Sequence, residues 1–228
     1  MQINRYLDHA VLKPQMSERE VREAIQLGID YKVFSVCVRP CDIPLALEMC
    51  EGTETLVSCV LDFPHGDAPA EAKEFLAKQY AGLGVHEIDM VLNFGYLRSG
   101  LYGQVLDGIQ RVVRQAHAKG VLVKVIFETG TLDTAQIQKG VDLCIQAGAD
   151  FVKTSTGFVE GGATLEAVQA MFRAADGKIQ VKPSGGIRNF ETAKLYVEMG
   201  AARLGVGYSS TPVICGGEES KAESREAY

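Results

Sequence analysis

The sequence predicts a single α/β domain, a (β/α)8 TIM barrel. Eight short apolar segments alternate with segments of helical pattern in one regular series, and the apolar segments are continuous rather than alternating. Continuous apolar strands indicate burial on both faces, as in a parallel sheet. Eight repeats in 228 residues, with no dinucleotide-binding fingerprint after the first strand, favour a closed barrel over an open doubly wound sheet.

The strands are predicted from apolar runs that end at prolines, glycines or polar residues, such as Lys13-Pro14 and Arg39-Pro40. The expected strands are residues 7–12, 33–38, 55–61, 87–92, 121–127, a short strand ending at Lys153, 179–182 and 203–206. These strands account for all eight repeats of the predicted barrel.

The helices are predicted from capping residues and one-sided apolar patterns. Ser17 with Glu20 forms a capping box, and Asp133 and Asn189 can each cap a later helix. Further helices are expected over residues 43–50, 69–83 and 101–119 and around residues 165–172, with a loop over 93–100. Glycines suited to helix C-caps recur at the helix-to-strand junctions, at Gly84, Gly120, Gly148 and Gly200.

Composition indicates an ordinary soluble protein with a real core, because 46% of residues are hydrophobic and 23% are charged. We expect residues 1–215 to form the barrel and the polar residues 216–228 to form a mobile tail. The net charge of −6 argues against nucleic-acid or membrane-surface binding, which favour a basic face. No apolar run reaches transmembrane length, and the N-terminus has no signal-peptide core.

The six cysteines match no disulfide or zinc spacing, so we expect reduced thiols in a cytoplasmic enzyme. Cys37 and Cys41 alone could suggest a metal pair, but no second pair or nearby histidine completes it. We therefore expect no metal site. The four histidines are expected to be surface or loop residues.

The active site of such a barrel lies at the carboxyl ends of the strands. Polar residues at the expected strand ends are Asp8, Cys37, Asp62, Asp89, Glu128, Lys153 and Lys182. Lys153 and Lys182 end neighbouring strands, where mutual repulsion and partial desolvation lower a lysine pKa from about 10.4. The free amine that results can attack a carbonyl to form a Schiff base.

Two readings of these charged residues remain open at this stage. The lysines could carry out amine chemistry, or each could pair with a nearby carboxylate and hold the barrel mouth together. Asp89, inside an apolar strand, could be a proton shuttle or a satisfied buried carboxylate. A carboxylate that bridges two lysines would fill both roles.

Small and hydroxyl residues follow three of the strands and suit an oxyanion, most simply a phosphate. Thr156 and Gly157 lie in the hydroxyl-rich run after Lys153. Gly185-Gly186 and Gly205-Val206-Gly207 follow strands seven and eight, where barrels often bind phosphate with loop amides. The pattern therefore predicts amine-based carbonyl chemistry on a phosphorylated substrate, with no bound cofactor.

Four motifs resemble those of the deoxyribose-phosphate aldolase family, and the resemblance runs from about residue 3 to residue 207. The motifs are Asp8-His9-Ala10-Val11-Leu12-Lys13-Pro14, Glu87-Ile88-Asp89-Met90-Val91, Lys153-Thr154-Ser155-Thr156-Gly157-Phe158 and Val181-Lys182-Pro183-Ser184-Gly185-Gly186-Ile187-Arg188. The resemblance implies a class I aldolase that reversibly cleaves 2-deoxy-D-ribose 5-phosphate to D-glyceraldehyde 3-phosphate and acetaldehyde. It also implies a homodimer, and a small phosphorylated sugar as the substrate.

The resemblance also implies roles for single residues. Lys153 matches the Schiff-base lysine, and Lys182 matches the second lysine that depresses its pKa. Asp89 matches the carboxylate that works with Lys182 and water in proton transfer. Asp8 matches an aspartate near the substrate hydroxyl, and Cys37 matches a pocket cysteine that a reactive aldehyde could modify.

Three features depart from, or bear on, the family pattern. Ala10 stands where the family usually has threonine, so one polar contact is missing. The family usually has one residue between the glycine after strand eight and a Ser-Ser pair that serves the phosphate. Here Val206-Gly207-Tyr208 separate Gly205 from Ser209-Ser210, so either the loop carries a two-residue insertion or the phosphate contacts are altered. The final residue, Tyr228, matches a terminal tyrosine that assists proton transfer in some members, or is an incidental tail residue.

Two alternatives to this activity remain. A sister class I aldolase could act on another phosphorylated aldehyde or ketose, and the altered loop after strand eight supports it. A non-catalytic sugar-phosphate binder could keep the same barrel, although a binder has no need of an amine with a lowered pKa.

Overall fold

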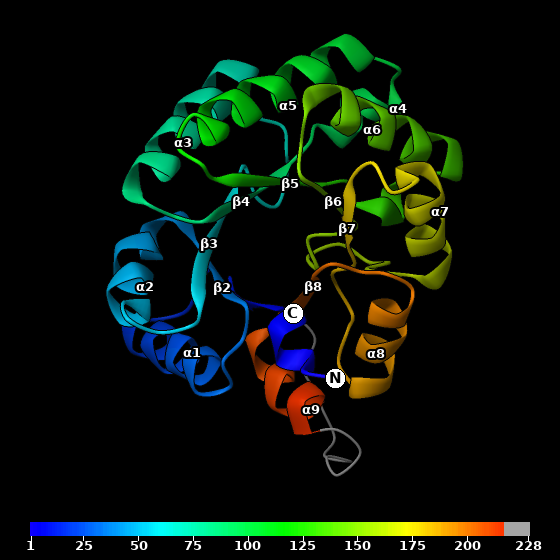
Figure 1. Cartoon of the computed structure of the whole chain (residues 1–228). Coiled ribbons are helices and arrows are strands. Elements are labelled where there is room, and N and C mark those ends of the chain that lie inside the picture. The colour runs from blue at the N-terminus through cyan, green and yellow to red at the C-terminus, as the bar shows by residue number, and fades with distance from the viewer. Residues whose placement is uncertain (217–228) are drawn as a thin grey trace.

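The computed structural model describes residues 1–216, which form a ring of eight parallel strands surrounded by helices (Figure 1). The strands are β1 (Leu7–Val11), β2 (Ser35–Val38), β3 (Leu56–Leu61), β4 (Glu87–Val91), β5 (Leu122–Ile126), β6 (Phe151–Lys153), β7 (Gln180–Lys182) and β8 (Leu204–Gly207). Their hydrogen-bonded order runs β7-β6-β5-β4-β3-β2-β1-β8. A parallel bridge between Ser184 and Gly205 joins the two ends of this order. The predicted barrel is therefore confirmed.

Helices follow the strands and cover the outside of the ring (Figure 1). They are α1 (Glu18–Asp30), α2 (Ile43–Cys50), α3 (Ala70–Leu83), α4 (Phe94–Arg98), α5 (Tyr102–His117), α6 (Thr134–Ala147), α7 (Leu165–Ala175), α8 (Phe190–Glu198) and α9 (Thr211–Gly216). The predicted caps are confirmed: Ser17, Asp133 and Asn189 each accept a hydrogen bond from a backbone N–H of their helix. Gly84 and Gly148 end α3 and α6 in the left-handed conformation that glycine adopts most easily.

The expectation of a loop over residues 93–100 is wrong, because this segment contains α4. The side chain of Asn93 accepts a hydrogen bond from the backbone N–H of Tyr96 and so caps the short helix. Two glycines within eight residues suggested a loop, but the cap and burial of Leu97 stabilise a single helical turn.

The expectation that all four histidines are surface or loop residues is wrong for His9. Its imidazole is fully buried, with Nδ1 2.8 Å from Thr211 Oγ1 and Nε2 2.9 Å from the carbonyl oxygen of Ala24. His9 alternates with Asp8 along β1, so its side chain faces the outer helices while that of Asp8 faces the barrel interior. His65, His86 and His117 are exposed.

The C-terminal boundary differs slightly from the expectation. Gly216, where the polar tail was expected to begin, is the last residue of α9, and residues 217–228 lie outside the described part of the chain. The predicted proton-relay residue Tyr228 therefore also lies outside it.

The apolar core lies between the strands and the helices, while the inside of the ring is polar and charged. Along β4, Ile88 and Met90 join the outer apolar core, whereas Glu87 and Asp89 contact charged side chains of other strands. Because side chains alternate along each strand, charged groups from several strands meet inside the barrel.

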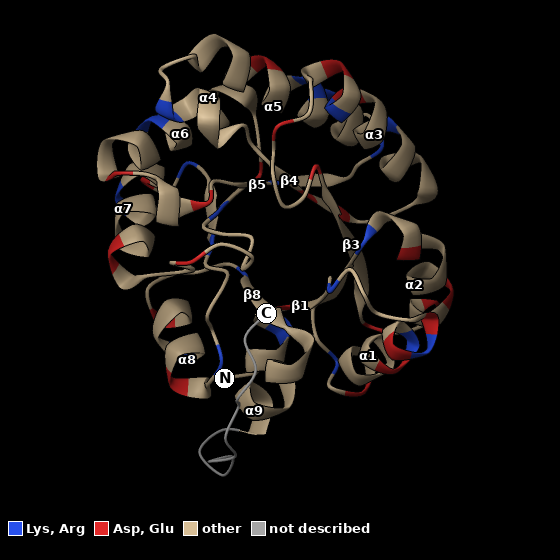
Figure 2. Cartoon of the chain, turned by 180° about the vertical axis from the view of Figure 1, so that it is seen from behind, with Lys and Arg blue, Asp and Glu red and all other residues tan. Residues whose placement is uncertain are grey.

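The outer surface carries charges of both signs, spread over the helices (Figure 2). On this surface Glu74 of α3 accepts hydrogen bonds from Arg111 and Arg114 of α5 and so links the two helices. All six cysteines are free thiols. Over residues 1–216, no helix is both long enough and apolar enough to cross a membrane.

Candidate active site

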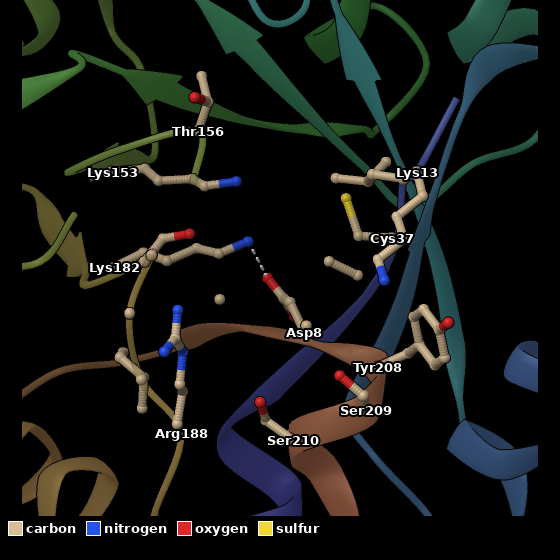
Figure 3. Close-up of a pocket in the computed structure, with 18 residues that line it drawn as sticks. Asp8, Lys13, Cys37, Lys153, Thr156, Lys182, Arg188, Tyr208, Ser209 and Ser210 are labelled. Carbon is tan, nitrogen blue, oxygen red and sulfur yellow. Dashed lines mark hydrogen bonds and ion pairs between the residues drawn. The ribbon is translucent and has the colours of Figure 1, made fainter. Parts of the chain in front are cut away.

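A cavity opens at the carboxyl ends of the strands, where the sequence places the site (Figure 3). The predicted residues on its wall are Asp8, Cys37, Lys153, Thr156, Lys182, Gly185, Gly186, Gly205 and Gly207. Asp89 is fully buried and does not line the cavity, but it contacts two lysines that do. Gly157 lies beside the cavity, in a shallow depression that Gly185 and Gly186 also line.

Lys153 and Lys182 lie side by side at the ends of β6 and β7. They are register partners in the ladder, and both ammonium groups contact Oδ2 of Asp89, at 3.0 Å from Lys153 and 2.7 Å from Lys182. Only 3% of Lys153 is exposed, yet it lines the cavity. The structure therefore combines the two sequence readings: the lysines hold the mouth together through Asp89, and both still line the cavity.

The environment of Lys153 favours its free amine. Burial lowers the pKa of Lys153, and the nearby ammonium of Lys182 lowers it further, while Asp89 opposes both effects. The net direction is downward from the ordinary lysine value, as the pairing of two lysines predicts. Lys153 is therefore the group at this mouth best suited to nucleophilic attack on a carbonyl.

Asp8 lies within β1 and serves as a permanently charged anchor. Its carboxylate accepts hydrogen bonds from Lys182 Nζ, from Ser35 Oγ at 2.7 Å and from Arg203 at 3.0 Å. Burial alone would raise the pKa of Asp8, but Lys124, Lys182 and Arg203 together hold it far below the ordinary aspartate value. Asp8 therefore stays ionised at neutral pH and fixes the position of Lys182.

Three charged residues beneath the cavity were not predicted from the sequence, namely Glu87, Lys124 and Arg203. Lys124 donates to Glu87 and, at 2.8 Å, to Asp89, and Arg203 makes a two-pronged contact with Glu87 at 3.0 and 3.1 Å. Each of the three is a charged residue within or beside an apolar strand. That signal, which drew attention to Asp89 and Lys153, could have found them too.

Cys37 lies on an apolar part of the cavity wall. It packs with Ala10, Leu12 and Val60 in a small cluster, against which Phe63 also packs. Burial, with a smaller contribution from Asp89, raises the pKa of the Cys37 thiol, although Lys182 and Lys153 oppose the rise. The thiol is therefore neutral at pH 7 and a weaker nucleophile than a thiolate.

Other residues of the cavity wall suit an anion. Lys13 and Arg188 lie on this wall together with Gly185, Gly186 and the two serines that follow β8. Ser209 and Ser210 belong to a single 3₁₀ turn (Tyr208–Ser210), and this turn returns both serines to the cavity despite the two extra residues before them. Cations, hydroxyls and glycine-rich backbone around one cavity fit a phosphate group.

Thr156 is held in place by a buried carboxylate. Its hydroxyl and its backbone N–H both donate to Glu128, which lies at the end of β5 with a left-handed backbone (φ +56°). Thr156 in turn accepts a hydrogen bond from the backbone N–H of Phe158. This chain of contacts fixes the hydroxyl-rich loop beside Lys153.

The cavity of this parallel barrel holds a buried lysine of lowered pKa together with residues that suit an anion. These features define an enzyme that acts on the carbonyl group of an anionic substrate. Comparison with known proteins places it more closely. The model of the DeoC/LacD family aldolases matches residues 4–210 of this chain. The chain therefore belongs to this aldolase family, as the four sequence motifs predicted.

Curated and solved relatives agree with this assignment. The deoxyribose-phosphate aldolase of Clostridium novyi is 41% identical over 221 residues, which cover 97% of this chain and 98% of the relative. The solved aldolase QR15 has a TM-score of 0.87 at 38% identity and covers 94% of each chain. The deoxyribose phosphate aldolase of Aeropyrum pernix, described as tetrameric, has a TM-score of 0.85 at 30% identity and covers 94% of this chain and 89% of its own.

Proposed function

We propose that this chain is a class I aldolase that reversibly cleaves 2-deoxy-D-ribose 5-phosphate to D-glyceraldehyde 3-phosphate and acetaldehyde. The observation that carries the proposal is the geometry of Lys153, which contacts Asp89 and lines the same cavity as the residues that suit an anion. Family membership and the names of the relatives support the same substrate. The steps proposed below use side chains of this chain together with water.

The first step is formation of a Schiff base. The free amine of Lys153 attacks the aldehyde carbon of the open-chain sugar, and the resulting carbinolamine loses water to give a protonated imine. The imine then withdraws electrons from the neighbouring carbon. Burial lowers the pKa of Lys153 most, and the charge of Lys182 lowers it further, so Lys182 favours this step.

The second step breaks the bond between the second and third carbons of the sugar. The hydroxyl on the third carbon loses its proton, its oxygen becomes the aldehyde of glyceraldehyde 3-phosphate, and the electron pair of the broken bond forms an enamine on Lys153. The enamine carbon then takes up a proton, and water releases acetaldehyde and the free amine. Proton transfer of this kind is typically worth about 10² to 10⁴ in rate.

We assign the proton transfers to Lys182, Asp89 and water. Lys182 lies on the cavity wall and contacts Asp89 at 2.7 Å, whereas Asp89 itself is fully buried. Protons would therefore reach substrate through Lys182 or a water molecule, with Asp89 holding Lys182 and Lys153 in register. Asp8, which also lines the cavity, is placed to contact a substrate hydroxyl.

We assign the 5-phosphate to the part of the cavity wall that carries cations, hydroxyls and glycine-rich backbone, namely Lys13, Arg188, Ser209, Ser210 and the Gly185-Gly186 turn. This assignment places the sugar aldehyde at Lys153. Cys37 would lie on the apolar wall, within reach of a reactive aldehyde but as a neutral thiol.

A product assay on the purified protein tests the activity. The expected result is stoichiometric release of D-glyceraldehyde 3-phosphate and acetaldehyde from 2-deoxy-D-ribose 5-phosphate, and loss of both in Lys153→Leu. Turnover of another phosphorylated ketose or aldehyde in place of this sugar would identify the sister aldolase. Phosphate-dependent binding without turnover of any such sugar would identify a binder.

We further propose that the protein works in the cytoplasm as a homodimer. Family resemblance supports the dimer, and six free cysteines suit a reducing compartment. Light scattering after size-exclusion chromatography tests the assembly. A mass of two chains is expected, and the mass of a tetramer, as described for the Aeropyrum pernix relative, would contradict it.

A further inference from the structure

The barrel interior holds a group of charged side chains connected by ion pairs, which we call the interior cluster and which includes Lys153. Its members are Asp8, Glu87, Asp89, Lys124, Lys153, Lys182 and Arg203. The most exposed of them, Arg203, is only 6% exposed. Each is joined to another member by an ion pair, so a change of charge at one member alters the electrostatic potential at the others.

Glu87 and Arg203 form the floor of the interior cluster, away from the cavity wall. One nitrogen of Arg203 contacts Asp8 at 3.0 Å and Glu87 at 3.1 Å, and the other contacts Glu87 at 3.0 Å. The guanidinium carbon lies 3.3 Å from the centre of the Phe34 ring, which closes that side. Glu87 also accepts a hydrogen bond from Lys124.

The interior cluster contains three carboxylates and four cations, so full ionisation leaves one surplus positive charge. Lys124 contacts all three carboxylates, and Lys182 and Arg203 contact two each. Lys153 contacts one oxygen of Asp89, which it shares with Lys182. Because a buried unpaired charge is costly, the surplus proton leaves from Lys153, the least neutralised cation.

The directions of the lysine pKa shifts agree with the number of carboxylates that each lysine contacts. Burial would lower the pKa of Lys124, but Asp8, Asp89 and Glu87 raise it well above the ordinary value. Lys153 moves the opposite way: its pKa is lowered by burial and by Lys182.

Two further titratable groups lie near Lys153 outside the interior cluster. Cys37 faces it from β2, and burial raises the pKa of this thiol, which leaves it neutral. Glu128 lies at the end of β5 and accepts hydrogen bonds from Thr156. Burial raises the pKa of Glu128, and its interaction with Lys153 is the smallest of the effects that oppose the rise.

We infer that Glu87 and Arg203 are positioning residues that set how readily Lys153 loses its proton, by fixing the charge balance of the interior cluster from below. They reach Lys153 only through Asp8, Lys124, Lys182 and Asp89, and they do not line the cavity. The inference rests on the proposed Schiff-base function of Lys153.

Three variants change the charge balance in known directions. Glu87→Gln removes a negative charge, which disfavours protonated Lys153, so the acid limb of kcat/KM moves to lower pH. Arg203→Gln removes a positive charge and moves that limb to higher pH. Each shift should be about one pH unit for a buried unit charge at this range. The double variant Glu87→Gln/Arg203→Gln restores the surplus of one and returns the limb close to its wild-type position.

A second readout does not depend on turnover. Competitive labelling of Lys153 by an amine-selective acylating reagent, followed by peptide mass mapping across pH, reports its protonation directly in folded protein. Arg203→Lys is the matched control, because it keeps the charge but loses the two-pronged contact. Its labelling curve should stay near that of wild type, even if kcat falls.

Shifts of opposite sign in the two single variants, cancelled in the double variant, are the expected result. Shifts of the same sign, or unmoved curves in all folded variants, would overturn the inference, because packing damage alone has no reason to follow charge. A wild-type protein that forms no imine on Lys153 would instead overturn the proposed function, and the labelling curves would still be measurable.

Discussion

Lys153 and Lys182 are register partners at the ends of β6 and β7 and share a single acceptor, Oδ2 of Asp89. Two ammonium groups on one oxygen are not equivalent here, because Lys182 also contacts Asp8 and Lys153 does not. Lys182 is thus held by two carboxylates and Lys153 by one. The asymmetry favours Lys182 as the charged partner and Lys153 as the nucleophile that we propose.

Removal of the charge at Lys182 should raise the pKa of Lys153. In Lys182→Met the like charge is lost, so the acid limb of kcat/KM should move to higher pH. The proton route is lost as well, so kcat/KM should fall by about 10² to 10⁴. Lys182→Arg keeps the charge, so its limb should stay in place while the rate falls. An unmoved limb in Lys182→Met would show that Lys182 does not influence the nucleophile.

A methyl group at Gly205 should disturb Ser184 and Lys182 on the cavity wall. A Cβ there would overlap Ser184 Oγ and lie 3.3 Å from Lys182 Cε, so Gly205→Ala must displace Ser184 and crowds Lys182. Displacement of about 1 Å near reacting groups costs about 10² in rate. Gly108→Ala is the control, because its Cβ meets nothing within 4 Å and lies in α5. A kcat of Gly205→Ala equal to that of the control would contradict the proposed geometry.

The phosphate assignment predicts a substrate-dependent effect of Arg188. Arg188→Met should raise KM for 2-deoxy-D-ribose 5-phosphate by about 10- to 100-fold, as expected for loss of a hydrogen bond between charged groups. The KM for unphosphorylated 2-deoxy-D-ribose should not change, because it lacks the anion. Steady-state kinetics on both sugars make the comparison. An equal rise for both would place Arg188 elsewhere than at the phosphate.

His9 predicts a specific dependence of stability on pH. Burial lowers the pKa of His9 to about 4, so the folded protein binds this proton less tightly than the unfolded chain. Its contribution to stability is full above the unfolded pKa of 6.5 and is lost as the pH falls toward about 4. The free energy of unfolding should therefore drop by about 2 kcal/mol between pH 7 and pH 5 from this group.

Urea unfolding of the wild type and His9→Gln at both pH values measures that loss. The variant should be less stable at pH 7 but should lack the His9 part of the slope. His65→Gln, at an exposed site, should keep the wild-type slope. A wild-type slope in His9→Gln would show that another group accounts for the dependence.

The barrel could be predicted because its evidence is local. Continuous apolar strands follow one another along the chain with capped helices between them, and Ser17, Asp133 and Asn189 cap helices as predicted. The helix α4 was not predicted, because a segment of eight residues with two glycines is typical of a loop and the cap by Asn93 is a single short signal. Its stability comes in part from burial of Leu97, which only the folded structure reveals.

The cavity wall could be predicted from residues at strand ends, but the contacts within the floor beneath it could not. Glu87 and Arg203 are 116 positions apart, and their contact depends on the register of strands across the whole ring. His9 was misjudged for a similar reason, because Thr211, its partner, comes from the other end of the chain. Pairings of this kind follow from barrel closure, which brings β1 beside β8.

Trapping of the imine shows directly whether Lys153 forms a Schiff base. The protein is incubated with borohydride and either acetaldehyde or 2-deoxy-D-ribose 5-phosphate at neutral pH, and the adduct is located by peptide mass mapping. A reduced adduct on Lys153 from both compounds, and none on Lys182, is the expected result. An adduct from acetaldehyde alone would favour a sister aldolase. No adduct on Lys153 from either compound, in folded protein, would contradict the Schiff-base mechanism.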